Sequence, residues 1–222
     1  MNEALAELLP LAVVIAVSPI PVLAVILMLL TERSTLNASA LLAGWALALT
    51  VIAAGVAALG IGSSEAGEDP GTAMIVAQFV LAALLLAGGL RRWRMHRRGG
   101  GEERHARWIE RLRSVGPAGA LVLGIGLIAL NPKDGLLTVA AGARLADADL
   151  GTGTAVGALM IFVAVSSTTI AAPILAELAL GDRAESILER SRAWLERNGN
   201  AALAVVLIAL GLLVAADAAR NL

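Results

Sequence analysis

Residues 5–30 read LAELLPLAVVIAVSPIPVLAVILMLL, an apolar run interrupted near its middle by Ser18, Pro19, Ile20 and Pro21. About 20 helical residues cross the roughly 30 Å hydrocarbon layer of a bilayer, so this run is long enough to span a membrane. Proline removes a backbone donor and clashes with the preceding turn, which kinks or breaks a helix. The stretch therefore predicts a transmembrane helix with a break at its middle.

The rest of the chain is equally apolar: 58% of the 222 residues are hydrophobic and 16% are charged. Soluble domains are about half apolar and a quarter charged. The runs are rich in Ala and Leu and show no alternation of period two, which excludes the strands of a membrane barrel. We predict an all-α, single transmembrane domain over residues 1–222. Its six spans lie near residues 5–30, 36–60, 72–90, 116–144, 153–180 and 199–217.

The arginines predict how these spans are oriented. Fourteen of the sixteen arginines fall in the loops after the first, third and fifth spans, nine of them in the basic loop 91–115. Positive charge favours the cytoplasmic side. With six spans, both termini are then expected on the non-cytoplasmic side of a bacterial inner membrane. The acidic start, with Glu3 and Glu7, does not resemble a cleavable signal peptide, so the first span is expected to remain.

A second break is expected in the fourth span, where residues 131–135 read NPKDG at a similar depth. The two breaks head the two halves of the chain, spans one to three and four to six. Paired interrupted helices at corresponding positions are typical of inverted repeats, whose substrate sites lie near the membrane midplane. We predict a 3+3 inverted repeat with broken first and fourth helices, although the halves share no sequence similarity beyond the breaks.

Lys133 is the only lysine of the sequence, and it is followed by Asp134 inside a predicted span. An unpaired charge there costs about 3 kcal/mol on insertion scales, so both side chains should face protein or water. Lys133 could bind an anionic substrate group or join a proton relay, with Asp134 as its partner. The alternative is an ion pair that only locks the break.

Other residues of the breaks have open roles. Asn131 and Ser18 could cap exposed helix ends or coordinate substrate. Glu177, near the end of the fifth span, could carry a coupling proton or extend into water. Four residues are expected to shape the breaks: Pro19, Pro21, Pro132 and Gly135.

No catalytic constellation or cofactor motif is visible. The chain has no cysteine, its two histidines (His96 and His105) lie in the basic loop without a cluster of ligands, and no phosphate-binding glycine loop with lysine occurs. We therefore expect no metal, no cofactor, no direct use of ATP and no enzymatic activity.

Residues 182–197 predict an amphipathic helix, with charged residues opposite an apolar face. That face comprises Ile187, Leu188, Ser191, Trp194 and Leu195. Such a helix could bind anionic lipid headgroups or gate the inner mouth. The alternative is that its arginines only fix topology and its tryptophan anchors a helix end.

Four motifs together resemble the lysine-exporter superfamily, and within it the actinobacterial glycolipid- and sulfolipid-addressing (Sap/GAP) proteins. They are Ser18 to Pro21, Gly44-Trp45, Asn131 to Lys133 and the Trp194-Leu195 helix. The amino-acid exporters of the superfamily usually have Gly before the first proline. Ser18 replaces it here, which favours the lipid-associated branch.

The resemblance implies a membrane transporter that exports or flips a cell-envelope lipid or glycolipid across the inner membrane. Expected partners are membrane lipids, an anionic lipid substrate, an envelope-lipid synthase or large lipid transporter, and further copies of the chain, but no nucleic acid. The alternatives are a small-solute exporter for amino acids or cations and a non-transporting scaffold for envelope lipid synthesis. Substrate, direction and energy source stay open.

Overall fold

The computed structural model describes residues 2–30, 34–60, 115–148 and 150–220, together with the isolated positions 87, 90 and 94. All secondary structure in these ranges is helical, which confirms the all-α class for this part of the chain. The elements are α1 (Asn2–Ala16), α2 (Pro19–Leu29), α3 (Ser34–Leu59), α6 (Pro117–Ala129), α7 (Pro132–Asp147), α8 (Thr152–Leu180), the 3-10 helix η1 (Gly181–Ala184) and α9 (Glu185–Arg220). The predicted span 72–90 and the basic loop lie almost wholly outside the described residues.

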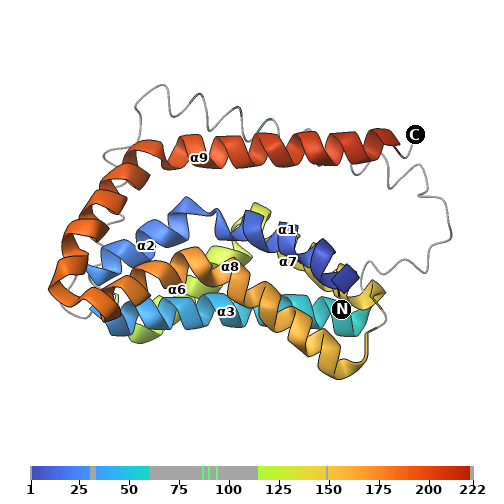
Figure 1. The fold of residues 1–222 in the computed structure, drawn as a ribbon, viewed down its shortest axis with the longest axis horizontal. Coiled ribbons are helices and arrows are strands. Elements are labelled where there is room, and N and C mark those ends of the chain that lie inside the picture. The colour runs from blue at the N-terminus through green and yellow to red at the C-terminus, as the bar shows by residue number, and fades with distance from the viewer. Residues whose placement is uncertain are drawn as a thin grey trace.

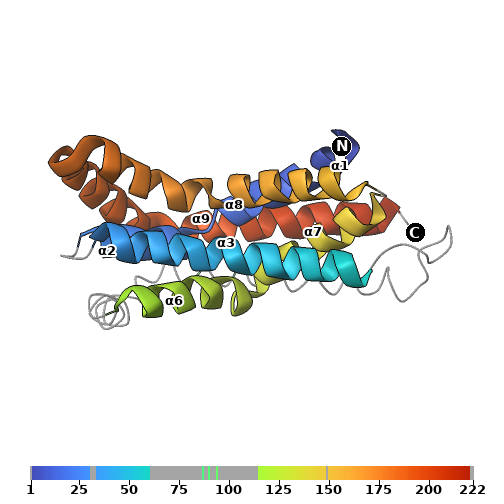
Figure 2. The same ribbon diagram turned by 90° about the horizontal axis from the view of Figure 1, so that it is seen from below.

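Both predicted breaks interrupt a helix. The axes of α1 and α2 differ by 54°, and those of α6 and α7 differ by 76°. Figures 1 and 2 show that the two helices of each pair follow one another along the long axis of the molecule, beside α3, which runs that length without a break. Each pair is therefore two consecutive helices bent at the predicted break.

By length and composition, two of the described helices, α3 and α8, can cross a membrane, and the number rises to four if each bent pair is one span. The apolar helices thus mark a membrane-embedded protein. The predicted sixth span, 199–217, lies within the 36-residue helix α9, which also contains most of the predicted amphipathic helix. The six-span arrangement itself stays a prediction.

The positions of the breaks follow from proline chemistry. Pro19 and Pro132 occupy the first turn of α2 and α7, where the missing N–H has no intrahelical partner to lose. Pro19 and Pro21 also cannot donate to the carbonyls of Ile15 and Val17, four residues earlier. Helix α1 therefore ends at Ala16. The carbonyl groups of its last turn need hydrogen-bond donors from other parts of the chain.

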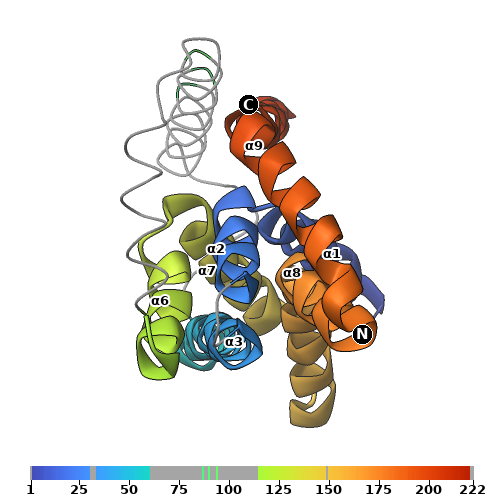
Figure 3. The same cartoon turned by 90° about the vertical axis from the view of Figure 1, so that its left-hand side faces the viewer.

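Glycines bring α3 and α6 into backbone contact. A Cβ atom on Gly44 would overlap the carbonyl of Leu121, and one on Gly124 would overlap the carbonyl of Leu41. Small residues allow this close approach, which replaces the hydrophobic effect as the attraction between helices in lipid. In the end-on view of Figure 3, α3 lies between α6 and α8, and it contacts both. The glycines thus hold α6 directly against α3.

The helix contacts are reciprocal between the two halves of the chain. Helices α1 and α2 pack on α8, α6 and α7 pack on α3, and the two broken pairs meet where α1 contacts α7. Helix α2 also packs on α3 of its own half and on α9. The start of α1 and the end of α9 lie at the same end of the bundle (Figures 1 and 2). In an inverted repeat, the broken pair of each half is expected to pack on a helix of the other half. The repeat itself stays a prediction.

Candidate functional site

The site begins with the local structure of the second break. The Asn131 side chain accepts a hydrogen bond from the Lys133 backbone N–H at 3.2 Å and so caps α7. The Gly135 N–H donates to the Asn131 carbonyl at 2.9 Å, which closes the first turn. This turn directs Lys133 and Asp134 into the bundle, where they are 6% and 0% exposed. Thr138, one turn later on the same face, is buried beside them.

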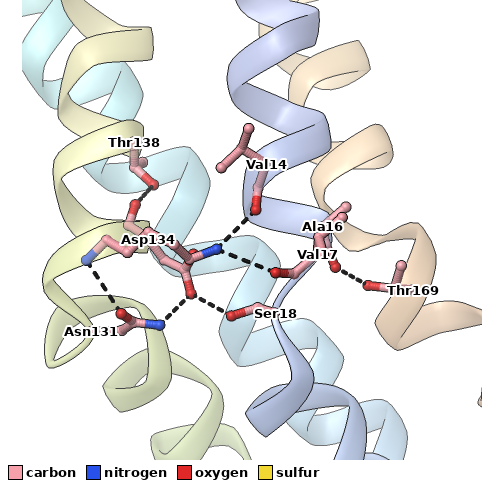
Figure 4. A network of polar contacts seen from close by, with 9 residues as sticks. Val14, Ala16, Val17, Ser18, Asn131, Asp134, Thr138 and Thr169 are labelled. Carbon is pink, nitrogen blue, oxygen red and sulfur yellow. Dashed lines mark hydrogen bonds and ion pairs between the residues drawn. The ribbon is translucent and has the colours of Figure 1, made fainter. Parts of the chain in front are cut away.

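The Lys133 ammonium reaches the carbonyls of Val14 and Val17 at the first break, two residues that Figure 4 labels. Its Nζ atom lies 2.8 Å from the Val14 carbonyl oxygen and 3.5 Å from that of Val17. These carbonyls lie at the end of α1, and Pro21 leaves the Val17 carbonyl without a helical donor. A cation is also favoured at the negative, carboxyl end of a helix. Lys133 therefore supplies the hydrogen bonds that the first break takes away.

Asp134 joins the two breaks through its two carboxylate oxygens. Oδ1 lies 2.8 Å from the Lys133 ammonium. Oδ2 accepts hydrogen bonds from the Ser18 hydroxyl at 2.9 Å and from the Asn131 amide. Oδ1 has no hydrogen bond from any other described residue, so the ammonium alone holds it. The carboxylate also lies in the first turn of α7, where the helix dipole favours negative charge.

Helix α8 contributes a third side to the cluster. The Thr169 hydroxyl donates to the Ala16 carbonyl at 2.6 Å, across 153 residues of chain (Figure 4). Three helix segments thus meet at one place: the end of α1, the start of α7 and the middle of α8. Nearby on α8, the hydroxyls of Ser166 and Ser167 are buried without a partner among the described residues.

The outer side of each break is apolar and exposed. Leu130 is 84% exposed and Leu136 is 52% exposed, on the side of the second break away from the ion pair. At the first break, Val17 and Ile20 are 40% and 37% exposed. Exposed apolar side chains therefore flank both breaks, whereas the charged pair is buried.

Four of the predicted site residues come together here: Ser18, Asn131, Lys133 and Asp134. Ser18 occupies the cap position of α2, yet its side chain makes no capping bond and donates to Asp134 instead. Glu177 does not join them, because it lies half-buried in the last turns of α8. It follows Thr169 by eight residues, about 12 Å along the helix axis.

Three partners were missed from the sequence, namely Thr169 and the carbonyls of Val14 and Val17. The sequence holds a weak signal for Thr169, because it ends the hydroxyl run Ser166 to Thr169 before Pro173, and such hydroxyls can bond to carbonyls freed at a break. The carbonyls gave none, since every residue has one. In the described ranges no three His, Cys, Asp or Glu side chains gather as a metal site, and His96 and His105 lie outside those ranges.

A family model described as "Sap, sulfolipid-1-addressing protein" matches residues 8–220, a range that contains both breaks. No curated protein matches, and no solved structure matches. The wider resemblance to the lysine-exporter superfamily stays a prediction.

Proposed function

This chain belongs to the Sap, sulfolipid-1-addressing protein family, and from that premise we propose that it moves an anionic lipid across the membrane, with the lipid headgroup binding at Lys133. Family membership points to a non-catalytic membrane protein in a sulfolipid context. A sulfate ester is an anion, and an ammonium group is a suitable partner for it. The observation that carries the proposal is the buried pair of Lys133 and Asp134 where two broken helices meet.

The burial of this pair favours a functional role. Charged residues inside membrane proteins are rare, and they mark substrate or ion pathways because their insertion is costly. A buried ion pair is also seldom a net gain in stability over apolar residues of similar size. Apolar side chains could have filled this position in an Ala- and Leu-rich bundle. The retained charges are therefore best explained by what they bind.

The geometry supports an exchange of anions at Lys133. Of its acceptors, the carbonyls of Val14 and Val17 are fixed parts of α1, whereas the Asp134 carboxylate is a side-chain anion. A sulfate or phosphate oxygen could take the place of Oδ1 without disturbing the carbonyl contacts. Asp134 would keep its Ser18 and Asn131 partners through Oδ2. In this proposal Asp134 occupies the site until a headgroup displaces it.

The apolar exterior of the breaks favours a lipid over a small solute. A lipid needs a polar site for its headgroup next to a surface for its acyl chains. Leu130 and Leu136 supply such a surface on the outer side of the break that carries Lys133. A small amino acid or cation has no acyl chains that would need such a surface. We therefore place the acyl chains along this side of α6 and α7.

A scaffold without transport activity is the second candidate, and one observation favours it. Lys133 has three N–H donors, and three acceptors already surround them. The pair could thus serve only to hold the two breaks together. In that case its charges would affect stability and nothing else.

Lipid movement in proteoliposomes tests the proposal. The probes are a fluorescent sulfated galactosylceramide and the same lipid without its sulfate, and dithionite bleaches the label that reaches the outer leaflet. Wild type is compared with Lys133→Met/Asp134→Asn, which removes both charges together, in the presence and absence of a proton gradient. Radiolabelled lysine serves as the small-solute probe. We expect wild type to move the sulfated lipid at least several-fold faster than the neutral one, and the double variant to lose this preference.

The control variant is Glu7→Gln/Arg144→Gln, which removes an exposed ion pair between α1 and α7. It should move lipid as wild type does. If a folded double variant moves the sulfated lipid at the wild-type rate, the headgroup does not bind at Lys133. If wild type moves neither lipid, the scaffold is the better account, and movement of lysine instead would favour the small-solute exporter.

A further inference from the structure

The first part of α9 carries an exposed stripe that the transport proposal does not use. Ile187, Arg190, Trp194 and Arg197 are spaced by three, four and three residues, which places them on one face of a helix. All four are exposed, Ile187 by 45% and Trp194 by 53%. We call these four residues the basic-aromatic stripe. Figure 1 shows this part of α9, in orange, at the end of the bundle where α2 ends.

The neighbouring faces of the helix have other roles. Leu188 is 3% exposed and belongs to the core, with Leu195 packed against it. The opposite flank carries the acidic side chains of this segment: Glu185, Glu189 and Glu196. The acidic side chains therefore lie on one side of the buried face, and Arg190 and Arg197 lie with Ile187 and Trp194 on the other.

The arginines differ in their partners. Arg192, on the acidic flank, is paired with Glu196 at 2.9 Å. Arg190 and Arg197 form no ion pair with a described residue, and the Nε atom of each donates to a carbonyl of its own helix, at 3.1 Å and 3.3 Å. Nη2 of Arg190 also donates to the Ser186 hydroxyl at 3.5 Å. The two guanidinium groups of the stripe thus keep donors available for an external anion.

We propose that the basic-aromatic stripe binds the headgroups of anionic phospholipids, with Trp194 and Ile187 inserted at the level of the acyl chain boundary. Arginines interleaved with a tryptophan and an aliphatic residue are typical of helices that lie at a lipid surface. The position fits, because the helix continues directly into the apolar residues 201–216. This inference is independent of the proposed transport.

Lipid binding by the full-length protein tests the stripe. Detergent-purified protein is titrated with phosphatidylglycerol or phosphatidylcholine, and the lipid-bound species are counted by native mass spectrometry. Arg190→Gln/Arg197→Gln should weaken phosphatidylglycerol binding by about fivefold per arginine. Arg192→Gln, which changes an arginine of the same helix that is already paired, should bind as wild type does. Phosphatidylcholine binding should be the same in all three proteins.

A second measurement examines Trp194 without disturbing the arginines. Wild type and Trp194→Phe are reconstituted into liposomes that contain brominated phosphatidylglycerol or brominated phosphatidylcholine. The difference in fluorescence between the two proteins reports on Trp194. Brominated phosphatidylglycerol should quench this difference more strongly than brominated phosphatidylcholine does. If the double arginine variant and Arg192→Gln bind phosphatidylglycerol equally, or if Trp194 is not quenched by either lipid, the stripe does not contact anionic lipid.

Discussion

The hydroxyl of Ser18 donates to Oδ2 of Asp134 at 2.9 Å, although 116 residues separate them. The bond links the start of α2 to the first turn of α7, so it fastens one broken helix to the other. The Lys133 ammonium makes the reverse connection, from α7 back to the end of α1. Each break is therefore completed by side chains of the opposite half of the chain.

The ion pair gives the first prediction, on stability. Asp134→Asn leaves the Lys133 ammonium buried without a counter-charge, and it should lower the free energy of unfolding by about 3 to 5 kcal/mol. Lys133→Met/Asp134→Asn removes both charges and should recover most of that loss. Chemical unfolding of the purified variants in detergent measures both values. A double variant as unstable as the sum of its single variants would show that the two side chains are not coupled.

Ser18 gives the second prediction. Ser18→Ala removes a buried hydrogen bond to a charged acceptor and should cost about 1.5 to 3 kcal/mol in the same unfolding experiment. Ser166→Ala is the matched control, because Ser166 is also buried and its hydroxyl has no partner within the described residues. It should cost clearly less. Equal losses for the two serines would argue against the bond between the breaks.

The third prediction concerns the contact between α3 and α6. Gly124→Ala would drive a methyl group into the backbone of α3 at Leu41, so the helices must separate. We expect a loss of stability of about 1 to 3 kcal/mol, as for other overpacked positions. Gly126→Ala, two residues away on α6, meets only the side chain of Leu130, the residue after the end of α6, at 3.9 Å. It should be neutral or slightly stabilising, and the opposite order would contradict the packing.

Topology gives the fourth prediction, and the cysteine-free sequence makes it simple to test. Single cysteines are introduced at the exposed positions Gly151, Ala193 and Ala219. With both termini outside, a membrane-impermeant maleimide added to intact cells should label positions 151 and 219. Position 193 should react only after the cells are opened. The reverse pattern would invert the predicted orientation.

Much of the candidate site was accessible from sequence because its residues are unusual in their setting. Lys133 and Asp134 stood out as charges in an apolar run, and Pro19 and Pro132 marked the breaks. Glu177 stood out for the same reason, yet it lies away from the cluster, because composition reports polarity and not position along the helix. The carbonyls of Val14 and Val17 could not be found, since a backbone acceptor becomes special only when its helical donor is lost and a cation lies nearby.

The sequence by itself determined that this chain is helical and membrane-embedded and that two of its helices break at proline motifs, because length, hydropathy and the missing proline N–H are local properties. It also placed one lysine and one aspartate at the second break. Only the tertiary structure decided what those charges contact. It determines which carbonyls accept hydrogen bonds from Lys133, and it shows that Ser18 donates to Asp134 and does not cap its own helix. It also shows that Thr169 donates to the carbonyl of Ala16. These contacts join residues more than 100 positions apart, and their partners are set by how the helices pack.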